Sequence, residues 1–430
     1  MCYTRDARRR GGLRAACLAL LPSALLLGCA PYQEMWTRPD LAAASIAAMD
    51  VDTAAVTQRV ILFGDGGSSG IDVDDPAHLV DPTLRALAAR AAEIPDRTTV
   101  AVLGDTVYPS GVPPADPARA YERRRAEAAL AAQLEAATSS GSSAVLVAGN
   151  HDWQYGQAGV DRQAGMVRRH AADGSRDITF APEPGNPGPV VMDIGDEIRL
   201  VALDTEWWIR ADFEPVEVSR FRLELTAAMA GAGDRRVIVI AHHPIASHGP
   251  HGGFYDLRKR FGGPVPSPVV GGILGAAVGG ALSLAKGEFW PLPFALYGVG
   301  LAVYMPTDAN FTLLHGIASA GQDIHTPPYQ YMLSVFRSVF ATHRPFVYAS
   351  GHEHVLEVLD GGEMADYLLV SGAGSKTSPV KHGANTLFDT YGEGFMIVDF
   401  LNDDRVTLRV ITTDDAPDGG AVAFTMDLDG

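Results

Sequence analysis

The chain has 430 residues, of which 47% are hydrophobic and 20% are charged, and its formal net charge is −17. This length suits one large domain or two ordinary ones, and the composition excludes a disordered, collagen-like or coiled-coil protein. A surface this acidic repels phosphate backbones, so nucleic acid is not expected as a partner. An anionic substrate would need a local positive charge, and a bound metal ion is the most compact source of one.

The N-terminus has the pattern of an export signal. All three cysteines lie within the first 29 residues, where a basic stretch leads into an apolar run at 15–27 that ends at Gly28-Cys29. This end resembles the lipobox of bacterial lipoproteins, in which the cysteine after the glycine becomes the lipidated first residue. The resemblance implies that residues 1–28 are removed and that Cys29 is acylated. A short transmembrane anchor and a plain secretory peptide are the alternatives.

The segment after the signal, residues 29–56, is rich in Pro and Ala and is predicted to tether the lipid to a domain at 57–430. Lipoproteins carry several acyl chains, which would hold the domain on a membrane surface. The Ala after Cys29 favours the outer membrane, facing the periplasm, if the source is Gram-negative. No cysteine follows residue 29, which excludes structural disulfides, a cysteine nucleophile and a thiolate zinc site in the domain.

Short β-branched or Leu-rich segments recur along the domain, each followed by a polar or glycine turn. They lie at 59–63, 98–103, 144–148, 198–203, 236–241 and 345–350. Segments with helical spacing at 84–92 and 118–137 separate the first three, which predicts an α/β sheet with crossover helices. Closely spaced segments at 367–371, 394–400, 405–412 and 421–426 predict an antiparallel set of strands.

An apolar insertion, predicted at about 249–322, interrupts this pattern. It contains two apolar runs, 269–285 and 289–305, each near the shortest length that crosses a bilayer. They predict either a buried or self-packed hairpin, or a hydrophobic flap that touches lipid or covers the active site.

Residue types that bind metals follow five of the predicted strands. In chain order these motifs are Gly64-Asp65-Gly66-Gly67, Gly104-Asp105-Thr106-Val107-Tyr108, Gly149-Asn150-His151-Asp152, His242-His243-Pro244 and Gly351-His352-Glu353-His354. An α/β sheet opens its crevice at the carboxyl ends of its strands, so we expect these side chains to converge. Mixed oxygen and nitrogen donors without cysteine suit Fe, Zn, Mn or Co. Burying so many ionisable groups has no structural benefit that offsets their desolvation, which favours a metal site.

The order of these motifs resembles that of the calcineurin-like metallophosphoesterases, over about residues 57–412. Tyr108, three residues after Asp105, resembles the purple acid phosphatase branch, as does the lack of a histidine two residues after Asp65. The segment Ser371-Gly372-Ala373-Gly374 resembles a loop of its small, tartrate-resistant members. Gly66 departs from the tryptophan usual at that position. The resemblance implies an α/β fold, a four-layer α/β/β/α sandwich.

The resemblance also implies two metal ions, iron paired with iron, zinc or manganese. The first metal would be held by Asp65, Asp105, Tyr108 and His354, and the second by the bridging Asp105 with Asn150, His242 and His352. His151 would lie outside the metal ligands, near the leaving group. The family has a further substrate-side histidine, for which His248 is the first candidate and His251 the second. In the family, this histidine follows the metal-binding histidine at a longer spacing than His248 follows His242.

These features predict an exported, lipid-anchored phosphoesterase that hydrolyses phosphate monoesters by attack of a metal-bound hydroxide, with His151 as general acid. The expected partners are a phosphate-ester substrate and a membrane, which the lipid anchor would reach and which a lipid-touching apolar insertion would also contact. One alternative is a phosphodiesterase acting on lipid headgroups, which the apolar insertion suggests. Another is a surface lipoprotein that binds metal without turnover, against which the complete ligand set argues.

Overall fold

The structure is a computed structural model that describes residues 35–47, 51–174, 177–210, 213–253, 321–414, 416 and 419–429. The predicted signal peptide with Cys29, and both apolar runs of the insertion, lie outside the described residues. Within the described ranges, no helix combines the length and the apolar character needed to cross a membrane.

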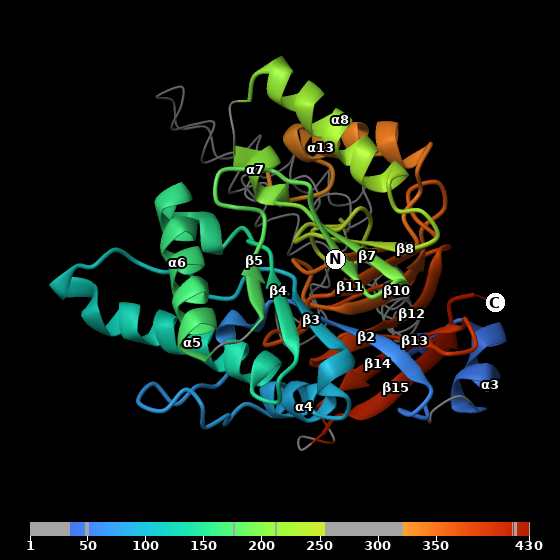
Figure 1. The fold of residues 1–430 in the computed structure, drawn as a ribbon, viewed down its shortest axis with the longest axis horizontal. Helices are drawn as coiled ribbons and strands as arrows, with labels where there is room; N and C mark the ends of the chain where they lie inside the picture. Colours follow the sequence, from blue (N-terminus) through green and yellow to red (C-terminus); the bar gives the residue numbers. More distant parts are fainter. Residues whose placement is uncertain are drawn as a thin grey trace, which may run out of the picture. The chain divides into compact units, whose positions relative to one another are not determined.

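The first of two mixed β-sheets combines strands from the first part of the domain with strands from its C-terminal end (Figure 1). Its parallel strands are β2 (Val56–Phe63), β3 (Thr98–Val102), β4 (Ser143–Leu146) and β5 (Ile178–Phe180). Beyond β2 the sheet continues in antiparallel register with β13 (Gly394–Leu401), β14 (Val406–Thr412) and β15 (Ala421–Asp427). The C-terminal strands thus extend the sheet that the first motifs belong to.

The second sheet also has a parallel centre with antiparallel edges. Its parallel strands are β7 (Ile198–Ala202), β8 (Arg236–Ile240), β9 (Val347–Ser350) and β11 (Tyr367–Ser371). The antiparallel strands are β6 (Val190–Ile194), β10 (Leu356–Asp360), β12 (Thr386–Thr390) and β1 (Met35–Thr37). The six strands predicted for the α/β part are confirmed, but they divide between the two sheets.

Helices cover the outer face of each sheet (Figure 1). The first sheet is covered by α4 (Pro82–Ala91), α5 (Ala120–Thr138) and α6 (Gln157–Gly174), and the second by α7 (Thr205–Arg210), α8 (Pro215–Ala230) and α13 (Pro327–Phe340). Short 3₁₀ helices lie in the connections: η1 (Gly66–Ser68), η2 (Pro95–Arg97), η3 (Pro117–Arg119) and η4 (Asp152–Tyr155). The fold is therefore the four-layer α/β/β/α sandwich that the sequence predicts.

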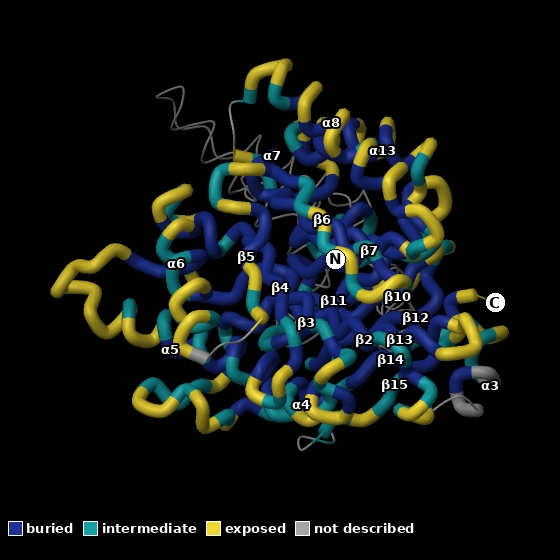
Figure 2. Tube along the Cα trace, in the orientation of Figure 1, coloured by how far each residue is buried: buried dark blue, intermediate teal, exposed yellow. Residues whose placement is uncertain are grey.

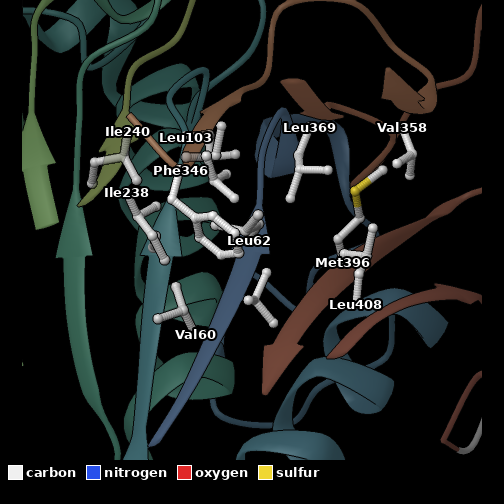
Figure 3. Packing of buried hydrophobic residues seen from close by; sticks show 14 of the residues in the cluster. Val60, Leu62, Leu103, Ile238, Ile240, Phe346, Val358, Leu369, Met396 and Leu408 are labelled. Carbon is white, nitrogen blue, oxygen red and sulfur yellow. The ribbon is translucent and has the colours of Figure 1, made fainter. Parts of the chain in front are cut away.

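The strand sequences explain this layering. In β2, Val60 and Leu62 point into the cluster between the sheets (Figure 3). Ile61 and Phe63 of the same strand pack against the helices. Alternate side chains of a strand face opposite sides, so a strand covered on both faces is apolar throughout. Figure 2 shows the result, with buried strands inside and exposed segments concentrated on the outer helices and loops.

Part of the predicted tether is folded. Helix α3 (Pro39–Ala47) follows β1, which pairs with β12 at the edge of the second sheet. The Ser45 hydroxyl accepts a hydrogen bond from the Thr425 amide at 3.0 Å, and Leu41 packs against the cluster between the sheets. These contacts place residues 35–47 within the sandwich, ahead of the boundary expected at residue 57, because strand pairing and apolar burial outweigh the loop-like composition.

Candidate metal centre

The predicted ligand motifs meet where the carboxyl ends of β2, β3, β4, β8 and β9 come together. The backbone is unusual at three of these positions, since φ is 60° at Asp65, 52° at Asp105 and 70° at His352. Residues with a side chain rarely adopt a positive φ, and such residues concentrate at functional sites. Gly149 allows the closest approach, because a Cβ there would lie 2.2 Å from Oδ1 of Asp105.

Two histidines are oriented by hydrogen bonds on the ring nitrogen that points away from the centre. Nδ1 of His242 lies 2.8 Å from the Leu103 carbonyl oxygen, and Nε2 of His352 lies 3.0 Å from the Gln322 carbonyl oxygen. A carbonyl only accepts, so each of these nitrogens carries the proton. The opposite nitrogens, Nε2 of His242 and Nδ1 of His352, therefore present lone pairs to the centre.

These lone pairs converge with a third acceptor. Oδ1 of Asn150 lies 3.0 Å from Nε2 of His242 and 3.2 Å from Nδ1 of His352. Three acceptors facing one another without a proton between them repel, and a cation at their centre removes that repulsion. The donor set thus fits a metal ion, with an amide oxygen and two imidazoles as ligands.

A second group of side chains lies beside the first. The Tyr108 hydroxyl donates to Oδ1 of Asp65 at 2.8 Å and lies 3.1 Å from Nε2 of His354. Asp105 stands between the two groups, with Oδ1 at 3.6 Å from Nε2 of His242. Asp65, Asp105 and His242 each offer a ligand atom within 4.8 Å of the others. All the predicted ligand residues are therefore brought together, with Asp105 in the central position expected of a bridge.

Burial controls the charge of this centre. Removal from water raises the pKa of Asp65 well above its usual value, and the neighbouring Asp105 carboxylate raises it further. Burial likewise lowers the pKa of His242, lowers that of His352 well below its usual range and lowers that of His354 to about 3. The histidines are neutral at neutral pH, which is the form that binds metals.

His151 lies at the edge of the centre. Its Nδ1 atom is 2.6 Å from the Pro109 carbonyl oxygen, and its Nε2 atom is 3.9 Å from Oδ2 of Asp105. The ring lies against Tyr108, with centroids 4.4 Å apart, and 31% of the side chain is exposed. The carbonyl fixes the ring, and Nε2 is the nitrogen on the Asp105 side.

The two other candidate histidines lie in different surroundings. Nδ1 of His248 is 3.2 Å from Glu357 and 3.4 Å from the Thr386 hydroxyl, and no contact among the described residues joins its ring to the predicted ligands. Nδ1 of His251 is 2.7 Å from Asp323, and its ring centroid lies 4.2 Å from that of His352. The structure therefore brings the second candidate, His251, to the centre.

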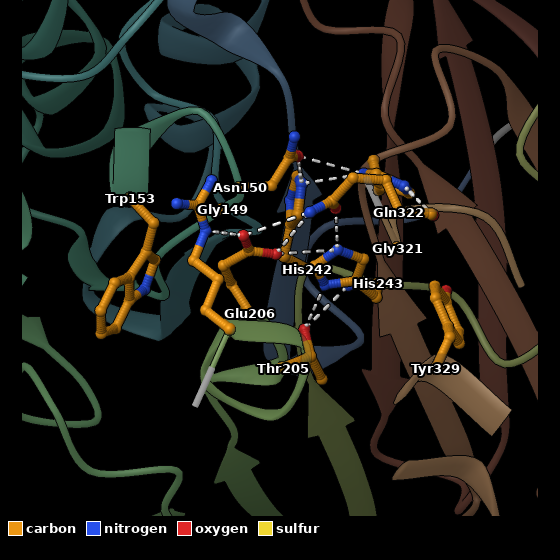
Figure 4. Close-up of polar contacts among 12 residues, drawn as sticks. Gly149, Asn150, Trp153, Thr205, Glu206, His242, His243, Gly321, Gln322 and Tyr329 are labelled. Atoms are coloured by element: carbon orange, nitrogen blue, oxygen red, sulfur yellow. Dashed lines mark hydrogen bonds and ion pairs between the residues drawn. The ribbon is translucent and has the colours of Figure 1, made fainter. Parts of the chain in front are cut away.

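Sequence reasoning missed a polar network behind the centre (Figure 4). Buried His243 bonds Thr205 through Nδ1 and the Gln322 side chain through Nε2, each at 2.8 Å. The Gln322 amide donates to buried Glu206 at 3.1 Å. His243 lies beside His242 and His352, but both of its nitrogens have protein partners. No sequence motif identifies Gln322. Its main-chain carbonyl orients His352, and any residue at this position would offer the same carbonyl.

Lys376 is a second residue that the sequence did not single out. Its Nζ atom lies 3.3 Å from the centroid of the Tyr108 ring. The only sequence signal is its place just after Ser371-Gly372-Ala373-Gly374.

The fold and the site together define a four-layer α/β protein with a candidate metal centre at the carboxyl ends of its central strands. No family model and no curated protein sequence matches the chain. Among solved structures, GAP50, "the anchor in the inner membrane complex of Plasmodium", aligns at 15% identity over 86% of this chain and 88% of its own, with a TM-score of 0.45. Purple acid phosphatase PPD1 from yellow lupin (Lupinus luteus) seeds aligns at 14% identity over 86% of this chain, with a TM-score of 0.46. This chain covers 53% of the lupin protein's length.

Proposed function

We propose that the protein is a phosphoesterase that hydrolyses phosphate monoesters at a centre of two metal ions. The observation that supports this most directly is the convergence of acceptor atoms from His242, His352 and Asn150, beside the Asp65 and Asp105 carboxylates. A buried cluster of acceptors is unstable without a cation, so its presence favours a metal-binding role over a structural one.

The ligands of the two ions are proposed from their grouping. Tyr108, His354 and Asp65 would hold one ion, and Asn150, His242 and His352 the other, with Asp105 shared between them. Metal ions at such a centre would supply a nucleophile from water near neutral pH and would neutralise the phosphoryl oxygens. Their local charge would also attract an anionic substrate to a chain whose net charge is −17.

His151 is proposed as the general acid. The Pro109 carbonyl holds the proton on Nδ1, so the imidazolium would deliver its other proton from Nε2. Nε2 lies 3.9 Å from Oδ2 of Asp105, and 31% of the His151 side chain is exposed.

His251, with Asp323 behind it, is proposed for the substrate-side role in place of His248. Its ring centroid lies 4.2 Å from that of His352, whereas His248 is bonded to Glu357. Hydrogen bonding to Asp323 counters the effect of burial, and the pKa of His251 is raised. A protonated His251 would place a positive charge beside the phosphoryl group.

The location of the protein is proposed from the sequence. Acylation of Cys29 would anchor the domain to a bacterial membrane, with β1 beginning a few residues after the lipid. The apolar insertion would offer a further contact with lipid.

The function is tested by measuring metal content and hydrolysis of p-nitrophenyl phosphate for the wild type and for Asp65→Asn. We expect about two metal ions per chain in the wild type, and in the variant loss of the ion that Asp65 would hold together with loss of activity. His78→Ala is the control, because 68% of the His78 side chain is exposed. A wild type that binds metal but hydrolyses no phosphate ester would support the metal-binding lipoprotein instead.

A further inference from the structure

Lys376 lies at the candidate metal centre without a role in the proposed chemistry. Its Nζ atom is 3.3 Å from the centroid of the Tyr108 ring, whose hydroxyl contacts Asp65 and His354. The charge of Lys376 also interacts with Asp105 and Asp65 through space. The ammonium group therefore lies on the side of the centre where Tyr108 is found.

The backbone before Lys376 is fixed to the loop that carries Asp65. The Ser375 hydroxyl donates to the main-chain oxygen of Asp65 and accepts from the Ser68 amide at 3.0 Å. The Gly374 amide donates to the Gly64 carbonyl at 3.0 Å. These bonds join the loop that carries Lys376 to the loop that carries Asp65. The fold therefore fixes the backbone position of Lys376 relative to Asp65.

The Lys376 ammonium group has no ion-pair partner among the described residues. Across the part of the chain that the structure describes, no carboxylate oxygen forms an ion pair with Nζ, and its close contact is the face of an aromatic ring. Ring contact stabilises a cation weakly and leaves its hydrogen-bond donors available. His151 contacts the same Tyr108 ring, with centroids 4.4 Å apart, so Lys376 and the proposed general acid are both neighbours of Tyr108.

We propose that Lys376 binds an anionic phosphoryl oxygen of the substrate and makes the site select monoester dianions over diester monoanions. This inference rests on the proposed function and names its substrate class. A lysine ammonium is a compact charge with several donors, and it binds more tightly to the more highly charged anion. In a diester, the second esterification converts a charged oxygen into a neutral ester oxygen, so the lysine gains less from binding.

The first test compares the wild type, Lys376→Met and Lys376→Arg on p-nitrophenyl phosphate and bis(p-nitrophenyl) phosphate. We expect Lys376→Met to lower kcat/KM for the monoester by about tenfold or more and for the diester by less than about threefold. Lys376→Arg retains the charge and should retain most of the preference for the monoester. Lys381→Met, which removes a lysine a few residues further along the chain, is the control and should leave the preference unchanged. Equal losses on both esters would overturn the proposal.

The second test does not require turnover. Isothermal titration measures how inorganic phosphate and dimethyl phosphate bind to the metal-loaded proteins. Lys376→Met should weaken the binding of inorganic phosphate by about tenfold and leave the binding of dimethyl phosphate nearly unchanged. Equal effects on both anions, or none, would overturn the proposal even in an active enzyme.

If the wild type hydrolyses neither ester, the proposed function fails, but the two binding affinities still decide the role of Lys376. Loss of bound metal in both Lys376→Met and Lys376→Gln would also contradict it, because the lysine would then support the metals and not the substrate.

Discussion

Nε2 of His242 and Nδ1 of His352 lie 3.3 Å apart, although the hydrogen bonds on the opposite side of each ring leave both atoms without a proton. Two lone pairs at this distance repel each other in a buried, weakly polarisable environment. Their arrangement is explained if a cation normally lies between them and Asn150, which presents its oxygen to the same point.

His352→Ala should therefore remove one metal ion. The remaining group of Asp65, Tyr108 and His354 would still offer oxygen and nitrogen donors to the other ion. We expect metal content to fall by about one ion per chain and hydrolysis to fall by about 100-fold or more, since both ions are needed to orient the phosphoryl group. Elemental analysis and a p-nitrophenyl phosphate assay check this, and retention of full activity would contradict it.

His151→Ala should separate chemistry from metal binding. The side chain contacts the centre only from its edge, so metal content should stay at the wild-type level. Loss of a general acid costs about 10²–10⁴-fold in rate when the leaving group is poor. The decrease should be large for an alkyl phosphate and small for p-nitrophenyl phosphate. Equal decreases for the two substrates would reject the acid role.

Metal binding should release protons and should strengthen as the pH rises. Burial and the Asp105 carboxylate raise the pKa of Asp65, so this carboxyl keeps its proton to a higher pH in the metal-free protein, and a metal ion that binds below that pKa must displace the proton. His242 and His352 have lowered pKa values and carry no extra proton at neutral pH, so they contribute none. Below the raised pKa of Asp65 the apparent affinity should fall with decreasing pH. Calorimetry in two buffers of different ionisation enthalpy measures the released protons, and affinity that is independent of pH would contradict the account.

Stability should depend strongly on a buried ion network away from the site. Oδ1 of Asp399 lies 2.6 Å from Nε of Arg59, and Oδ2 lies 2.6 Å from Nη2 of Arg409. Asp399→Ala leaves two buried guanidinium groups without this partner and should cost about 3–5 kcal/mol in the free energy of unfolding. Asp403→Ala, which breaks an exposed pair with Arg405, is the control and should barely change the melting temperature. Similar urea midpoints for the two variants would contradict this reading.

The sequence predicted the motif strands well because each is a short apolar run ending in a turn. The division of these strands between two sheets could not be read from periodicity, because residues 60–63 of β2 and 237–240 of β8 are apolar on both faces of the strand. Strand β1 was missed because it has only three residues and owes its conformation to pairing with β12. Pairing between strands thus determined the sheet to which each strand belongs and the presence of β1, which the local sequence does not specify.

The ligand residues were accessible to sequence reasoning because each follows a predicted strand. His251 was ranked second because spacing alone does not show which side chain turns toward His352. Its partner Asp323 lies beyond the insertion, so the pair forms only in the folded chain. Gln322 acts on His352 through its main-chain oxygen, which leaves no trace in the side-chain pattern. Lys376 is a single charge in a loop and gave no motif.

The proposed two-metal centre shared through Asp105 is tested by measuring metal stoichiometry and hydrolysis on the same samples. The wild type should hold about two ions per chain and hydrolyse p-nitrophenyl phosphate. Asp105→Asn keeps the size of the side chain but removes its charge, and it should lose both metal and activity. A variant that keeps two ions and near-normal turnover would contradict the account.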